Sequence, residues 1–137
     1  MPVFPSDEWM AEFCRLLEEH PESDDVARAL DGVYRFVIEP GGPLRESHVY
    51  DVSIRPTGTG AKVGLVEHET EDPRLTMATD YNRWQQLVRG DLDVGMALML
   101  RRLRVSGELT RLMSNVSSAR PLVDSLSGVD TIWLEEQ

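Results

Sequence analysis

The feature that most constrains the fold is a change in hydrophobic period near residue 33. Before it, Trp9, Phe13, Leu16 and Leu17 recur at the spacing of one apolar helix face. After it, apolar and polar residues alternate, as in strands with one face exposed to solvent. Helical spacing returns at Asp80. A chain that changes period in this order is predicted to fold as an α+β domain.

Turn-forming residues divide the alternating region into short strands. We expect strands at 33–38, 50–55, 61–65 and 75–79, and a fifth at 103–105, with glycine and proline clusters at 40–43 and 56–60. Parallel crossovers need a dozen or more residues, so these short spacings favour antiparallel neighbours. The sequence therefore predicts a five-stranded, largely antiparallel sheet.

The helices are expected to gather on one face of this sheet. Ser6 is a candidate N-cap for one helix before the strands, and a second short helix is expected to start at Ser23. Asp80 and Asp93 are candidate N-caps for two helices after the strands. Gly90 is placed to end the third helix. A helical pattern also starts at 108, and the proline at 121 is expected to divide it into two helices. The length of 137 residues fits one domain, residues 1–137.

The segment 94–100 is the most apolar helix candidate. No charged residue lies between Asp93 and Arg101, so this helix would be apolar on nearly every side. Such a helix is expected either to be fully buried or to face a nonpolar cavity as well as the sheet.

The charge balance argues against nucleic acid as a partner. Acidic residues number 24 against 14 basic ones, for a net charge of -10, and this field repels phosphate backbones. The cluster of Arg101, Arg102 and Arg104 lacks interleaved aromatic residues, so pairing with nearby acids or contact with an anionic head group is expected instead. Lys62 is the only lysine, which fits either a GC-rich genome or a halophilic source. Stability measured against molar KCl would separate these two.

No catalytic residue, metal site or cofactor is predicted. Cys14 is the only cysteine and is expected to be a small core residue. His48 and His68 fall in the sheet region, but their spacing does not converge on a metal, and no nucleophile or phosphate-binding motif is present. Because there is no signal-peptide pattern and no apolar run of 18 residues, a cytoplasmic protein without a transmembrane segment is expected.

The segment 79–115 resembles the sterol carrier protein type-2 family. Residues 79–90, with a capping Asp80 and a closing Gly90, resemble a helix of that family. The apolar run after Asp93 is similar to the next family helix, and 103–109 to its short strand, glycine, acidic residue and helix start. The order of elements agrees over nearly the whole chain. Arg101 departs from the pattern, because the family commonly has glycine there, and Arg102 and Arg104 stand where lysine is more usual.

The resemblance implies an apolar tunnel between the sheet and the helices. It would bind fatty acid, acyl-CoA, sterol or isoprenoid without catalysis, so a lipid or fatty-acyl ligand is the expected partner. Residues expected to line the tunnel from the sheet and from the helices are Phe36, Ile38, Val52, Ile54, Leu65, Met77, Trp84, Leu87, Met96, Met99, Leu100 and Met113. For each of them, plain core packing is the competing interpretation.

Two other functions stay open. One is an interaction module in which the apolar surface serves dimerisation, for example as a homodimer, and no lipid is bound. The other is a hydrolase or acyltransferase that uses His48 or His68. Activity that survives delipidation and vanishes when the histidine becomes alanine would support the last of these.

Overall fold

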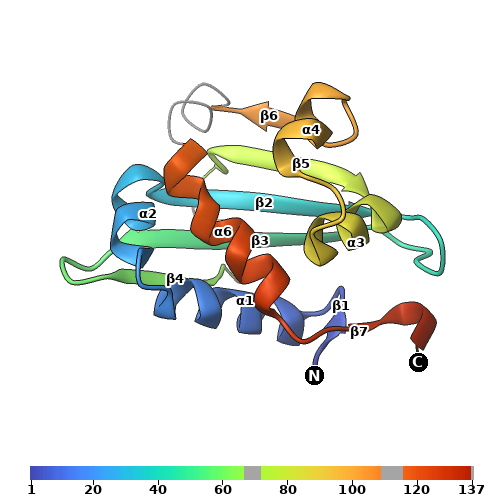
Figure 1. Ribbon diagram of the computed structural model, residues 1–137, viewed down its shortest axis with the longest axis horizontal. Coiled ribbons are helices and arrows are strands. Elements are labelled where there is room, and N and C mark those ends of the chain that lie inside the picture. The colour runs from blue at the N-terminus through green and yellow to red at the C-terminus, as the bar shows by residue number, and fades with distance from the viewer. Residues whose placement is uncertain (67–71, 109–115, 137) are drawn as a thin grey trace.

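A five-stranded sheet forms the back layer of the molecule (Figure 1). We analysed a computed structural model, which describes residues 1–66, 72–108 and 116–136. The strand order is β4-β3-β2-β5-β6. The strands are β2 (Gly32–Glu39), β3 (His48–Pro56), β4 (Ala61–Leu65), β5 (Leu75–Asp80) and β6 (Arg104–Gly107). The predicted five-stranded sheet is therefore confirmed.

The central pair of this sheet is parallel. β2 pairs with β5 in parallel register, with Phe36 opposite Met77, whereas the β2–β3, β3–β4 and β5–β6 pairs are antiparallel. The chain leaves β2, forms the β3 and β4 strands on one side, and then returns to the other side of β2. Short spacings indicated the antiparallel pairs, but they could not reveal this long return.

The helices cover one face of the sheet, as expected (Figure 1). They are α1 (Asp7–Glu19), α2 (Ser23–Ala29), α3 (Tyr81–Arg89), α4 (Val94–Met99) and α6 (Val116–Gly128). Ser6 caps α1 by accepting a hydrogen bond from the Trp9 amide at 3.1 Å. Asp80 caps α3 in the same way, so both cap predictions are confirmed.

The prediction that proline 121 separates two helices is wrong at that position. α6 runs continuously from Val116 through Pro121 to Gly128. Because proline has no backbone N–H, one helical hydrogen bond is missing at this position, but the helix continues. Any helix start at 109–115 lies outside the described residues.

A second, two-stranded sheet joins the ends of the described chain. β1 (Val3–Phe4) pairs in parallel with β7 (Ile132–Trp133), and a short 3-10 turn, η1 (Leu134–Glu136), follows. Strands of two residues are too short to show alternation, so these two strands were not predicted from the sequence.

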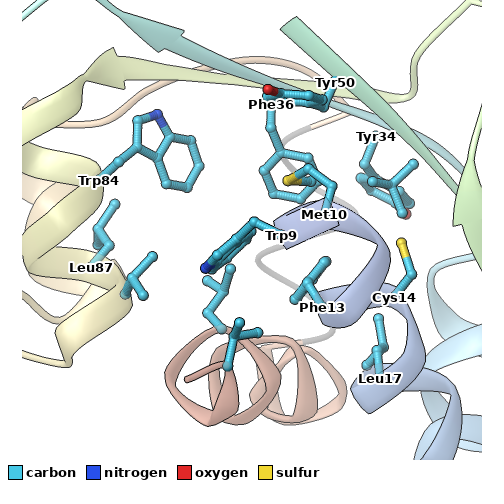
Figure 2. Packing of buried hydrophobic residues seen from close by; sticks show 14 of the residues in the cluster. Trp9, Met10, Phe13, Cys14, Leu17, Tyr34, Phe36, Tyr50, Trp84 and Leu87 are labelled. Atoms are coloured by element: carbon cyan, nitrogen blue, oxygen red, sulfur yellow. The ribbon is translucent and has the colours of Figure 1, made fainter. Parts of the chain in front are cut away.

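One apolar core fills the space between the two layers. It extends from Phe4 to Trp133 and includes one face of the sheet. Figure 2 shows Trp9 and Phe13 of α1 directed toward Phe36 of β2, with Trp84 of α3 beside them. The Phe13 and Phe36 rings pack edge to face, with their centroids 6.0 Å apart.

The opposite face of the sheet is polar. Arg35 and Asp51 form a two-pronged ion pair at 2.8 and 3.0 Å across β2 and β3, and Arg104 pairs with Glu39 across β6 and β2. This arrangement confirms the expectation of strands with one solvent-exposed face.

Candidate functional site

Alternation and register place a set of apolar side chains together on the inner face of the sheet. Tyr34 lies opposite Val52 on one side and Leu75 on the other, and the Phe36–Met77 pair lies two residues further along. Because strand residues two apart share a face, these positions form one continuous apolar surface. The surface faces the helices (Figure 2).

A small apolar cavity lies between this surface and the helices. Its volume is about 30 Å³ and its wall is entirely apolar. The residues that line it are Phe13, Leu30, Tyr34, Phe36, Val52, Ile54, Leu75, Met77 and Leu122. One water needs about 10–15 Å³ of such space, and an apolar cavity of roughly 150 Å³ is known to bind benzene. In this conformation the cavity is therefore closed to an acyl chain.

Eight of the residues predicted to line a tunnel lie in or around the core. Phe36, Val52, Ile54 and Met77 line the cavity itself. Ile38, Trp84 and Leu87 are buried next to it in the same core, and Leu65 is half-buried at the end of β4. These positions agree with the predicted inward direction, whereas their role in lipid binding stays a prediction.

The orientation predicted for the apolar helix is wrong for three residues. Met96, Met99 and Leu100 are 49%, 79% and 51% exposed, so they do not face the sheet. Within α4, only Ala97 is fully buried among the side chains that the structure describes. α4 has only six residues, fewer than two helical turns. A helix this short packs one side against the protein and leaves the other side in solvent, even when its residues are apolar. The remaining predicted residue, Met113, lies outside the described part of the chain.

Five cavity residues were not among those predicted. Tyr34 and Leu75 share strand faces with Phe36 and Met77, so the alternation alone could have identified them. Phe13 belongs to the apolar stripe of α1, and Leu30 and Leu122 come from the end of α2 and from α6. No local sequence pattern indicates which helix residues face a cavity.

The end of α4 is a Schellman turn with arginine at its left-handed position. The Arg102 amide donates to the Ala97 carbonyl at 2.8 Å, and the Arg101 amide donates to the Leu98 carbonyl at 3.2 Å. Arg101 has φ of 57°, where glycine is strongly preferred. This geometry gives a physical reason why glycine would suit position 101.

α6 covers part of the cavity and contains two features that lower its stability. Its Leu122 lines the cavity, between a proline that interrupts the helix ladder and Ser125. The Ser125 hydroxyl is buried and has no hydrogen-bond partner within the described structure. A buried unsatisfied hydroxyl and a missing helical hydrogen bond both lower the stability of the packed state.

Burial changes the acidity of two titratable side chains in the described core. Burial raises the pKa of Cys14 to about 12, so its thiol stays protonated at neutral pH and is a poor nucleophile. Burial also raises the pKa of Tyr50 to about 12, and its hydroxyl lies 3.3 Å from Nδ1 of His48. His68 lies outside the described residues.

The described residues also contain neither a cluster of metal-binding side chains nor a helix that could span a membrane. Among residues 1–66, 72–108 and 116–136, no group of three or more His, Cys, Asp or Glu side chains could hold a metal ion. In the same parts of the chain, every helix is too short or too polar to cross a bilayer.

Solved structures share this fold. The solution structure of a conserved hypothetical protein from Thermus thermophilus superimposes with a TM-score of 0.73 at 20% identity, over 93% of this chain and 90% of that one. A crystal structure of sterol carrier protein 2 gives 0.72 at 21% identity, over 90% and 97% of the two chains. The sterol carrier protein domain 2 of Helicoverpa armigera gives 0.59 at 19% identity, over 96% and 99%.

The sequence comparison identifies the family. A search of curated proteins found no match. The sequence model of the SCP-2 sterol transfer family matches residues 13–120, which span β2 to β6 and most of the helical layer. The chain belongs to the SCP-2 sterol transfer family.

Proposed function

We propose that this protein is a cytoplasmic, non-catalytic carrier that binds a lipid in the apolar space between the sheet and the helices. The ligand class is a lipid with a long apolar part: a fatty acid, an acyl-CoA, a sterol or an isoprenoid. The observation that carries the proposal is the wholly apolar cavity against the inner face of the sheet, in a chain of this family.

The energetics favour a long apolar ligand. Each methylene removed from water contributes roughly 0.8 kcal/mol, so twelve methylenes supply about 10 kcal/mol before ordering costs. Micromolar affinity corresponds to about 8 kcal/mol, so twelve methylenes reach it only if the ordering costs stay below about 2 kcal/mol, and longer chains are favoured. A purely apolar wall discriminates weakly between chain lengths, so a range of related lipids is expected to bind.

Binding on this scale requires the cavity to expand, and α6 is the element we expect to move. Its ladder is interrupted at Pro121, its Ser125 hydroxyl is unsatisfied, and Leu122 between them lines the cavity. Displacing α6 therefore sacrifices less favourable packing than displacing α1, whose Trp9, Phe13 and Leu17 are buried at 1% exposure or less.

The non-catalytic part of the proposal is supported by the chemistry of the core. Cys14 is held as a neutral thiol, and the His48 ring packs beside Tyr50 with ring centroids 6.2 Å apart. Neither arrangement activates a nucleophile, because activation needs an adjacent base or a depressed pKa.

A pair of matched valine variants tests the site. Val52 lines the cavity from β3, and Val49 is 55% exposed on the opposite face of the same strand. We expect Val52→Phe to weaken binding of a fluorescent fatty acid at least about tenfold, because the new ring occupies the ligand space, whereas Val49→Phe leaves it unchanged. Circular dichroism checks that both variants fold, since overpacking costs about 1–3 kcal/mol.

Two outcomes would refute the site. Wild-type protein that takes up no fatty acid would refute lipid binding itself. Folded Val52→Phe protein with wild-type affinity would refute this location. If Val52→Phe does not fold, Leu122→Phe on α6 places the same kind of added volume at the cavity from the helical side.

The alternative is an interaction module that dimerises and has no physiological lipid. The exposed Met99 and Leu100 are the observation in its favour. Sedimentation over a range of protein concentrations separates the two functions, because only the module requires self-association. A dimer without fatty-acid uptake would favour the module.

A further inference from the structure

An apolar patch projects from the molecule at the end of α4. Met96, Met99 and Leu100 are each about half exposed or more, although large apolar side chains are usually buried. The turn that follows the helix wraps around buried Ala97, to which both Arg102 and Leu103 donate backbone hydrogen bonds. This anchoring holds the exposed side chains on a fixed turn.

Two arginines border this patch. Arg101 and Arg102 are exposed, and neither has an ion-pair partner among the residues that the structure describes. Arg104, in contrast, is paired with Glu39. The acidic Asp93 lies at the other end of α4, where its carboxylate accepts a hydrogen bond from the Met96 amide at 3.1 Å. The C-terminal end of α4 is therefore both apolar and positively charged.

The rest of the molecule carries the opposite charge. The chain has a net charge of -10, and acidic residues are concentrated on α1 and α2. α1 packs over β4, at the far edge of the sheet from β6, and Figure 1 shows α4 beside β5 and β6. Four strand spacings of about 4.8 Å separate these edges, so the distance between them is about 19 Å. This distance exceeds the electrostatic screening length of about 8 Å at physiological salt. The acidic helices can therefore point away from a surface that α4 touches.

The turn that follows α4 is tied to a strand that lines the cavity. Oγ1 of Thr79 donates to the Arg102 carbonyl at 2.7 Å, which ties the turn after α4 to β5. Thr79 lies two residues beyond cavity-lining Met77 on the same face of that strand. A surface bound by α4 would thus be connected, through this turn, to the strand that contributes Met77 to the cavity wall.

We propose that the C-terminal end of α4 docks the protein on anionic lipid bilayers. Met96, Met99 and Leu100 insert between the lipids at the interface, and Arg101 and Arg102 bind the phosphates of the head groups. This inference rests on the proposed lipid-carrier function, and it adds the donor and acceptor surface with which the carrier exchanges its ligand.

A second copy of the chain fits this patch less well. A symmetric dimer would bring the same arginines together from both copies, and both copies carry a net charge of -10. Five side chains are also far fewer than the roughly 20–30 residues a side of a stable protein interface. An anionic bilayer, in contrast, complements both the charge and the apolar side chains.

Vesicle sedimentation tests the docking surface. We expect wild-type protein to bind vesicles of phosphatidylcholine and phosphatidylglycerol, to bind phosphatidylcholine alone much less, and to dissociate as salt is raised. Each cation at an anionic surface contributes a factor of about five, so Arg101→Asn with Arg102→Gln should weaken partitioning roughly 25-fold. Asparagine at 101 tolerates the left-handed backbone, so this variant is expected to fold. Met99→Ser with Leu100→Ser should weaken partitioning at least about tenfold.

Two exposed residues elsewhere provide matched controls. Val49→Ser removes an exposed apolar side chain from β3, and Lys62→Gln removes a positive charge from β4, at the far sheet edge. Both should bind vesicles as the wild type does. Equal vesicle binding by the wild type and the α4 variants would overturn the proposal. So would a dimer that Met99→Ser with Leu100→Ser dissociates while vesicle binding is unchanged, because the partner would then be a second copy.

Fatty-acid uptake measured without vesicles separates this inference from the function on which it rests. The arginine variant should take up a soluble fluorescent fatty acid with wild-type affinity and lose only vesicle binding. Wild-type protein without uptake would refute the carrier function whatever the vesicle result. An arginine variant that loses uptake as well would overturn the docking role, because these residues would then belong to the ligand site.

Discussion

The two consecutive helices α3 and α4 begin and end with the same capping structures, but α3 packs an apolar face into the core and α4 leaves large apolar side chains exposed. Each starts at an aspartate that caps the helix, and each ends in a Schellman turn. α3 buries Trp84, Leu87 and Val88 against the core, whereas α4 leaves Met96 and Met99 49% and 79% exposed. The comparison shows that an apolar helix is buried only when its length and pattern present one face to a neighbour. Composition alone does not decide it.

The largest expected difference is between Trp84 and Met99. Trp84 is 3% exposed, and its Nε1 donates to the Val37 carbonyl at 2.9 Å, whereas Met99 is 79% exposed. We expect Trp84→Ala to lower the free energy of unfolding by about 3–5 kcal/mol and Met99→Ala to change it by no more than about 0.5 kcal/mol. Urea denaturation measures both. A Met99→Ala loss above about 1 kcal/mol would show that α4 is packed.

The next effect is at the end of α3. Gly90 has φ of 80°, and a Cβ there would come no closer than 3.9 Å to its nearest neighbour, Oγ of Ser127. Gly90→Ala therefore adds backbone strain without a clash, and we expect a loss of about 1 kcal/mol in thermal or urea unfolding. Gly58→Ala is the matched control for backbone strain alone, because Gly58 also has a positive φ, 88°, and a Cβ there would meet only open space. A neutral Gly90→Ala would mean that this turn readjusts.

The corresponding position of α4 should respond in the opposite direction. Arg101 already has φ of 57°, so Arg101→Gly relieves the strain that Gly90→Ala introduces. The greater entropy of glycine in the unfolded chain offsets part of the gain, which leaves about 0.5 kcal/mol of added stability. If Arg101→Gly instead destabilised the protein, the arginine side chain would be making a favourable contact.

The smallest effect is an acid-sensitive link between α3 and the end of the chain. Desolvation raises the pKa of Glu135, but hydrogen bonds from Gln85 and from the Tyr81 hydroxyl outweigh it and hold that pKa below its ordinary value. Stability from such a group is present above the pKa of the unfolded carboxyl and is lost as the pH falls through the lower, folded pKa.

Glu135→Gln should therefore lower the free energy of unfolding by a few tenths of a kcal/mol at neutral pH, a small effect because Glu135 is exposed. It should also make the free energy of unfolding less dependent on pH at the acid end. Denaturation at a series of pH values measures this. An unchanged acid limb would show that the contacts of Glu135 contribute nothing to stability.

Much of the fold followed from hydrophobic period and capping residues. Alternation identified the five strands of the main sheet, and Ser6, Asp80 and Asp93 marked helix starts correctly. The parallel β2–β5 pair and the β1–β7 sheet could not be predicted, because they depend on contacts between segments distant in sequence. Local periodicity carries no information on such pairing.

The candidate site was predictable only in segments where apolar residues lie on one face and polar residues on the other. Strand alternation directed Phe36, Val52, Ile54 and Met77 inward, and all four line the cavity. In the apolar run 94–100 every position is a candidate for burial, so periodicity could not show that Ala97 is buried and Met99 exposed. The cavity itself depends on how α1, α2 and α6 pack together, which no single segment encodes.

The central claim is that the apolar space under the sheet holds a lipid. Native mass spectrometry of the purified protein, followed by denaturing extraction and identification of any released small molecule, tests it most directly. We predict a one-to-one adduct whose released component has a fatty-acyl or isoprenoid mass, and whose occupancy falls in Val52→Phe but not in Val49→Phe. A clean mass of the protein alone, with no adduct after incubation with fatty acid, would contradict the claim and leave the cavity as ordinary core.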